Sequence, residues 1–132
     1  MNANNNFKFS RRSELNLIGI HPDLEKVIRH ALRVSEIDFS VIEGLRTQDR
    51  QKQLFNQGKS KTLKSRHLTG HAVDLAPLVN GVIPWNHWPY FEKLAMAVKL
   101  AARTLGISII WGGDWTSLKD GPHFELPKKN YP

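Results

Sequence analysis

The sequence contains no cysteine among its 132 residues. This absence excludes disulfide bonds and thiolate metal sites, so any zinc site in the chain must use histidine and carboxylate ligands. No stretch approaches the roughly 20 apolar residues that cross a bilayer, which predicts no stable insertion into a membrane. The polar N-terminal segment also lacks the apolar core of a secretory signal. We therefore expect synthesis in the cytoplasm without a signal peptide.

Acidic residues are scarce as well. Twelve Asp and Glu residues oppose 19 Lys and Arg residues, which gives a formal net charge of +7. A basic chain is attracted to anionic polymers, and these include nucleic acids, anionic lipid surfaces and acidic cell walls. The charge does not choose among them. A non-catalytic nucleic-acid-binding module therefore stays open as an alternative, although the chain has no recognisable motif of such modules.

The length of the chain predicts one domain. A chain of 132 residues corresponds to about one domain and can bury roughly two-thirds of its unfolded surface. Its hydrophobic content of 40% and charged content of 23% are those of an ordinary globular protein, which argues against disorder. We expect residues 1–6, which are rich in asparagine, to form a flexible tail and residues 7–132 to form a single domain.

Three segments have the apolar spacing of helices. The first covers residues 21–35. The second covers residues 48–58, with Thr47 as the N-cap and Gly58 at the end. The third covers residues 85–106 and has the most continuous apolar face.

Four shorter segments have the composition of strands, and they are residues 38–44, 71–79, 107–111 and 123–126. Alternation in the first places Phe39, Val41 and Glu43 on one side. Asn80-Gly81 is a strong signal for a tight turn after the second strand. The predicted fold class is α+β, with a small, largely antiparallel sheet and helices packed against it.

The stretch SRHLTGHAVDL places two histidines and an aspartate close together. His67 and His71 are four residues apart, as on a zinc-binding helix, but Leu68 stands where that motif has glutamate and Gly70 is a poor helix residue. We therefore expect a turn that leads into a strand, with His67 before the turn and Asp74 in the strand.

A third ligand could come from His123 in KDGPHFEL. Three protein ligands with an open fourth position are the usual arrangement of catalytic zinc. Asp120 lies three residues before His123, and the Gly121-Pro122 turn between them could direct both side chains to one side. From the residues alone, isolated surface or core histidines and an ordinary turn stay open as alternatives.

Two segments resemble the phage-type L-alanyl-D-glutamate peptidases, which belong to the wider zinc family of D-alanyl-D-alanine carboxypeptidases and dipeptidases. They are EGLRTQDRQKQLFNQGKSKTLKSRHLTGHAVDLAP and WGGDWTSLKDGPHFEL. The family pattern S-x-H-x-x-G-x-A-x-D is matched at Ser65, His67, Gly70, Ala72 and Asp74. A second pattern, an acidic residue followed after two positions by histidine, is matched at Asp120 and His123. The similarity covers nearly the whole chain.

The resemblance implies a role for five residues. His67, Asp74 and His123 would bind Zn²⁺, Asp120 would be the catalytic acid and base, and Arg46 would stabilise charge on the scissile carbonyl. His71 falls on a variable position of the pattern and is left out of the metal site.

The same resemblance implies the function. We expect a zinc-dependent peptidoglycan endopeptidase that cleaves the L-alanyl-D-glutamate bond of the stem peptide, as a monomeric phage endolysin that does not bind nucleic acid. It would wait in the host cytoplasm and reach the wall in the periplasm after a separate pore has formed. The alternative on the same fold is a D-alanyl-D-alanine carboxypeptidase.

Three further features bear on the site. Trp111 and Trp115 either line a substrate groove or pack in the core. Glu125, which alternates with Phe124 on a strand, is expected to support the site. The basic loop at residues 59–66 is either a solvated surface or a contact for anionic peptidoglycan.

Overall fold

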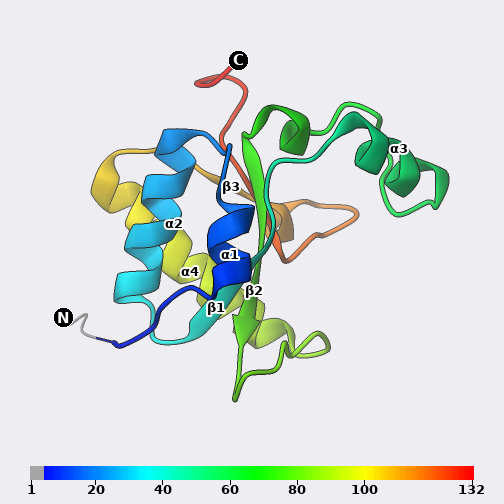
Figure 1. Ribbon diagram of the computed structural model, residues 1–132. Helices are drawn as coiled ribbons and strands as arrows, with labels where there is room; N and C mark the ends of the chain where they lie inside the picture. Colours follow the sequence, from blue (N-terminus) through cyan, green and yellow to red (C-terminus); the bar gives the residue numbers. More distant parts are fainter. Residues whose placement is uncertain (1–4) are drawn as a thin grey trace.

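The computed structural model describes residues 5–132 (Figure 1). Its elements in chain order are α1 (Arg11–Asn16), α2 (Pro22–Val34), β1 (Asp38–Glu43), α3 (Gln48–Asn56), the 3₁₀ helix η1 (Arg66–Thr69), β2 (Ala72–Leu78), α4 (Trp88–Leu105), β3 (Ile110–Trp111), the 3₁₀ helix η2 (Gly112–Asp114) and β4 (His123–Glu125). The strands form one antiparallel sheet in the order β1-β2-β4-β3. The predicted α+β class is confirmed.

The core lies between the sheet and the pair of helices α2 and α4. Both helices present one apolar stripe, as their sequence spacing predicts. The buried residues of the stripes are Leu24, Val27, Ile28, Ala31 and Leu32 in α2, and Phe91, Leu94, Ala95, Val98, Ala101 and Ala102 in α4. These side chains join Phe39, Val73 and Phe124 of the sheet in a single cluster. This core covers one face of the sheet.

The largest differences from the prediction are the start of one helix, the length of one strand and the presence of one additional short helix. Helix α4 begins at Trp88 instead of residue 85, because residues 84–87 form turns and Pro89 occupies the first turn of the helix, where its missing N–H costs nothing. The strand expected at residues 107–111 is limited to Ile110–Trp111. The short helix α1 was not predicted, and the hydroxyl of its N-cap, Ser10, accepts a hydrogen bond from the Ser13 N–H.

Two local predictions are confirmed. Thr47 is the N-cap of α3 and accepts from the Arg50 N–H at 3.1 Å. Asn80 and Gly81 both have positive φ, 53° and 78°, and Val79 pairs with Val82 across them. Two successive residues with positive φ are the signature of a tight hairpin turn.

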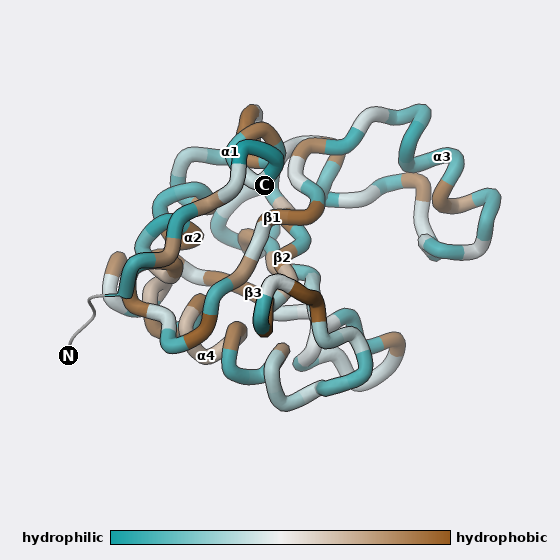
Figure 2. Tube along the Cα trace, turned by 60° about the horizontal axis from the view of Figure 1, so that its bottom comes forward, coloured by the Kyte–Doolittle hydropathy of each residue, from teal (hydrophilic) through white to brown (hydrophobic). Residues whose placement is uncertain are grey.

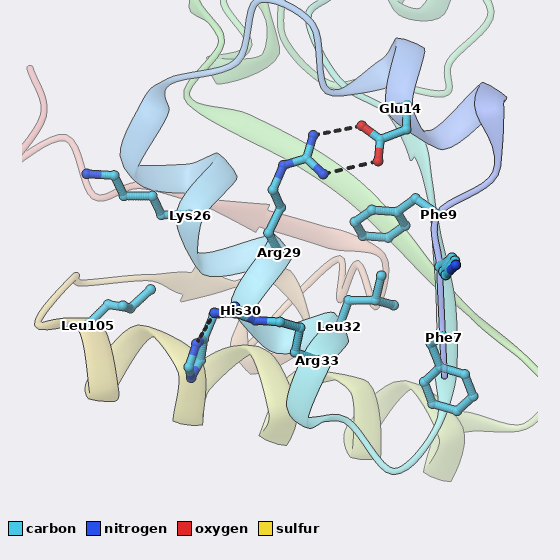
Figure 3. A pocket seen from close by; sticks show the side chains of 10 residues that line it. Phe7, Phe9, Glu14, Lys26, Arg29, His30, Leu32, Arg33 and Leu105 are labelled. Carbon is cyan, nitrogen blue, oxygen red and sulfur yellow. Dashed lines mark hydrogen bonds and ion pairs between the residues drawn. The ribbon is translucent and has the colours of Figure 1, made fainter. Parts of the chain in front are cut away.

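The N-terminal segment packs beside α2. The Asn5 side chain donates hydrogen bonds to the carbonyl oxygens of Leu32 and Ser35, at the C-terminal end of that helix. Arg29 links α2 to α1 through Glu14, as Figure 3 shows. The groove in that figure has a volume of about 660 Å³. Residues 1–4 of the predicted tail lie outside the described residues.

Helix α3 and the loop after β3 project from the side of β2 opposite to α2 and α4 (Figure 1). The chain along α3 is mainly hydrophilic (Figure 2), and only Gln51 and Leu54 of this helix are buried. Within residues 5–132, no helix combines the length and the hydrophobicity that a membrane span requires. The two projecting segments form the walls of the cleft described next.

Candidate metal centre and active-site cleft

His67 lies within η1, a single 3₁₀ turn, and not before the turn as we expected. Ser65 caps this turn by accepting from the His67 N–H, and Gly70 ends it with a φ of 76°, the left-handed conformation that glycine adopts readily. The imidazole is only 2% exposed. Its Nδ1 lies 2.9 Å from the Gly44 carbonyl oxygen. Because a carbonyl can only accept, Nδ1 carries the hydrogen, and Nε2 keeps its lone pair.

Asp74 and His123 face each other across two neighbouring strands. They are direct partners in the register of β2 and β4, so their side chains share one face of the sheet. His123 Nε2 lies 2.7 Å from Glu125 Oε1, two residues along the same strand. A carboxylate accepts, so Nε2 is the donor and Nδ1 faces Asp74. Glu125 therefore supports the site by fixing the orientation of the His123 ring.

The three side chains meet at one point. Their ligand atoms all lie within 4.8 Å of one another. Asp74 Oδ1 is 3.3 Å from His67 Nε2 and 3.5 Å from His123 Nδ1, but it is buried without a hydrogen-bond partner. One carboxylate oxygen and two imidazole nitrogens thus point into the same small space. Such a group of acceptors is stabilised by a cation, and this group can hold a metal ion.

The pKa values of the side chains without a metal agree with a cation-binding group. Burial lowers the pKa of His123, but its contacts with Asp74 and Glu125 outweigh that effect and raise the pKa to about 9. Burial raises the pKa of Asp74, yet the His123 and His67 rings hold it well below its usual value. The acceptors therefore keep a proton when no metal is bound. A metal ion would replace that proton.

Asp120 reaches the same cleft from the segment after η2. Its backbone N–H donates to Gly112 O, and its carbonyl oxygen accepts from the His123 N–H. A Cβ atom at Gly112 would lie 2.4 Å from the Asp120 carbonyl oxygen, so only glycine allows this close approach. Burial, and then the negative charge of Asp74, raises the pKa of the Asp120 carboxyl. A carboxyl with a raised pKa exchanges protons more readily near neutral pH.

Arg46 is the cation of the site. Its side chain is 8% exposed, and its Nη2 lies 3.8 Å from Asp74 Oδ2. Nε contacts Glu43 and Nη1 contacts Gln51, both at 2.8 Å. The backbone N–H of Arg46 also donates to the His67 carbonyl oxygen. The two side-chain partners hold the guanidinium beside the metal-binding group.

Sequence reasoning missed both partners of Arg46. Alternation placed Glu43 on the side of Phe39 and Val41, which is the core side. That placement is wrong, because a bulge lies between Val41 and Glu43 and makes Glu43 the partner of Asp74. A bulge adds one residue to a strand and so turns the next side chain to the other face. The spacing of Glu43, three residues before Arg46, was the one available signal.

The cleft around these groups has a volume of about 790 Å³. Its lining includes the site residues Arg46, His67, Asp74, Asp120 and His123, and the basic loop residues Lys59, Lys61 and Lys64. Trp115 lines the cleft with its ring 5.1 Å from that of His123, whereas Trp111 is buried in the core. His71 lies outside the cleft, beside His21. Arg66 is structural, since it donates to the Leu126 and Tyr131 carbonyl oxygens.

The fold has a counterpart among solved structures. A vancomycin-resistance D,D-dipeptidase, VanXYg, has the same fold, with a TM-score of 0.50 and 14% identity over 81% of this chain and 50% of that one. This likeness extends to the fold alone.

The family follows from the sequence. Residues 5–127 match the family described as phage L-alanyl-D-glutamate peptidase, and the chain belongs to that family. It is 38% identical to the L-alanyl-D-glutamate peptidase of Escherichia phage T5, over 95% of this chain and 93% of the relative. It is 52% identical to the L-Ala D-Glu endopeptidase ChiX of Serratia marcescens, with a TM-score of 0.89 and 96% of each chain covered. The resemblance stated from the motifs is confirmed.

Proposed function

We propose that this protein is a zinc-dependent peptidoglycan endopeptidase that cleaves the L-alanyl-D-glutamate bond of the stem peptide, as a phage endolysin. The observation that carries the proposal is the convergence of one ligand atom each from His67, Asp74 and His123. The Asp74 oxygen is buried and unpartnered, and the open cleft around it also holds Asp120 and Arg46. Family membership supports the choice of bond.

The three converging residues would hold the zinc ion. When bound, zinc supplies Lewis acidity at the scissile carbonyl. Asp120 takes a proton from the attacking water and later gives one to the amine of the departing D-glutamate, so that the C–N bond breaks as water adds across it. Arg46 offers a fixed positive charge to the oxygen that becomes negative.

The arrangement of Arg46 suits this task. Glu43 and Gln51 occupy Nε and Nη1, so the guanidinium does not have to reorganise during the reaction. Nη2 has no hydrogen bond as close as these, since Asp74 Oδ2 is 3.8 Å away. A donor that is oriented in advance stabilises developing charge better than one that must first be oriented.

The partner and the place of action follow from the same proposal. The substrate is the peptidoglycan stem peptide, and the lysines of the cleft favour an anionic peptide. The enzyme acts as a monomer and binds no nucleic acid. It is made in the host cytoplasm and reaches the wall in the periplasm once a separate pore has formed.

Mass spectrometry of the products released from purified peptidoglycan tests the proposal. New peptides that begin with D-glutamate are the expected result. Release of D-alanine instead would establish the carboxypeptidase alternative. Incubation with duplex DNA in parallel with sacculi distinguishes the two peptidases from a nucleic-acid-binding module. Such a module would bind the DNA and release nothing from the wall.

A further inference from the structure

Gln51 is fully buried on a helix that is otherwise mostly solvent-exposed. Its exposed fraction is 0%, and Leu54 is the one other buried residue of α3. A buried amide is costly unless its polar atoms have partners. The contacts of Gln51 therefore show what this residue is placed to hold.

The amide joins two separate parts of the cleft. Its Oε1 accepts from Arg46 Nη1 at 2.8 Å, whereas its Nε2 donates to Ser60 Oγ at 2.9 Å and to the Thr62 carbonyl oxygen at 2.6 Å. A guanidinium can only donate and a carbonyl can only accept, so the amide has a single possible orientation. One end contacts the site arginine, and the other contacts the loop that lines the cleft.

The segment held by Nε2 is the part of the basic loop at residues 59–64. The other hydrogen bonds of this loop are local. Lys59 N and Ser60 N donate to the Leu54 carbonyl oxygen, and Lys64 N donates to Thr62 Oγ1. These bonds shape the loop but do not orient it toward the reacting groups. Gln51 supplies that connection, because its other end is bound to Arg46.

We infer that Gln51 is a positioning residue with two separable effects. Through Oε1 it sets the orientation of the Arg46 guanidinium, which acts on the reacting carbonyl and so affects kcat. Through Nε2 it holds the 59–64 loop in place as the wall of the cleft that binds the anionic peptide, and so affects KM. This inference rests on the proposed function.

Two substitutions separate the two effects. Gln51→Glu keeps an acceptor for Arg46 but loses both donors to the loop. Gln51→Met has a similar length and loses every polar contact. The matched control is Gln53→Glu, which makes the same change of charge at an exposed position of α3 outside the cleft. All proteins are zinc-loaded, and thermal unfolding first establishes that each variant is folded.

Kinetics on a short soluble stem peptide give the first readout. Both Gln51 variants should raise KM by about tenfold, the effect of losing a hydrogen bond of typical strength. The value of kcat should fall by about 10- to 100-fold in Gln51→Met, because a small displacement of a reacting group is enough to do so. In Gln51→Glu, kcat should fall less than in Gln51→Met, and Gln53→Glu should match the parent. Equal losses of kcat in both Gln51 variants with no change in KM would overturn the inference.

Two further readouts do not depend on cleavage. Amide hydrogen exchange of residues 59–64 should quicken in both Gln51 variants. The NMR signal of the Arg46 Nε–H should shift strongly in Gln51→Met and less in Gln51→Glu. If the parent enzyme released no peptide beginning with D-glutamate, the proposed function would fail. The two measurements would still test whether Gln51 positions Arg46 and the loop at residues 59–64. Unchanged exchange and an unchanged Arg46 signal would show that Gln51 only fills space.

Discussion

Two arginines of this protein illustrate how a site differs from an ordinary charged surface. Arg29 of α2 lies in the groove and contacts the Glu14 carboxylate at 2.7 Å (Figure 3). It also contacts the Glu25 carboxylate at 2.8 Å, and its side chain is 44% exposed. Arg46 lies in the cleft, where its side chain is 8% exposed. It contacts one carboxylate and one amide closely, and a second carboxylate only at 3.8 Å.

The two arginines differ in how far their positive charge is neutralised by ion pairs and screened by water. Arg29 is neutralised by its partners and screened by water, and exposed pairs of this kind contribute about 0–1 kcal/mol to stability. Arg46 is withdrawn from water, so its field acts over a longer distance and is screened less. The cleft also contains the unpartnered Asp74 Oδ1. Buried groups with unmet interactions, more than the number of charges, distinguish the cleft from the groove.

The largest effect is expected when one histidine of the cleft is compared with one histidine of the groove. His67→Ala should remove a metal ligand, so stoichiometric zinc and peptidoglycan cleavage should both disappear. His30→Ala, in the groove, should keep both. Elemental analysis beside turnover measures the outcome. Full zinc content in the His67→Ala protein would require a different ligand set, and removal of zinc from the parent by a chelator should reproduce the loss of activity.

The next largest effect is expected at Asp120, whose role is proton transfer. Asp120→Asn keeps the size of the side chain but cannot accept a proton, so turnover should fall by about 100- to 10,000-fold. Zinc should stay bound, in contrast to the His67→Ala protein. Loss of zinc from the Asp120→Asn protein would make Asp120 a ligand. Full zinc with normal turnover would move the role of base to another carboxylate, with Glu125 as the next candidate.

The two arginines themselves give the third prediction. Arg46→Met should lower kcat by about 100- to 1,000-fold, the usual effect of losing one oriented donor to a developing negative charge. Arg29→Met should leave kcat unchanged and lower the free energy of unfolding by about 1 kcal/mol, because its ion pairs are exposed. Steady-state kinetics and urea unfolding measure the two. Equal effects on kcat would show that burial does not separate these arginines.

The sequence was sufficient for those parts of the site that depend on local pattern. The strands predicted at residues 71–79 and 123–126, and the Gly121-Pro122 turn after Asp120, place Asp74, His123 and Asp120 near their observed positions. The helical stripes that form the core depend on the same kind of pattern.

The parts that the sequence could not give depend on contacts between distant segments. Glutamine is a polar residue, so the sequence predicts that Gln51 is exposed on its helix. It is buried because the loop at residues 59–64 contacts it. Helix α1 is short and has little periodicity of its own. The Ser13 hydroxyl accepts from the Val41 N–H, and Asn16 donates to the Val41 carbonyl oxygen, so α1 is held against β1 by tertiary contacts.

The smallest effect is expected from the exposed basic residues. The test is whether those of the cleft contribute more to wall attachment than those of the groove. Reversing Lys59, Lys61 and Lys64 to glutamate lowers the formal net charge from +7 to +1. The same change at Lys8, Lys26 and Arg33 of the groove is a control with equal net charge. Attachment to sacculi should weaken in both proteins, and more in the cleft variant, because its charges lie where the peptide binds.

Salt and a soluble peptide complete that test. Exposed charges are screened over about 8 Å at physiological ionic strength, so added salt should weaken attachment of the parent and reduce the difference between the two variants. On a short soluble peptide the cleft variant should have a raised KM and a nearly normal kcat, since its lysines bind the substrate without touching the reacting carbonyl. Equal attachment by both variants would mean that the wall responds to net charge alone. A large fall in kcat would instead place the lysine loop among the groups that act on the scissile bond.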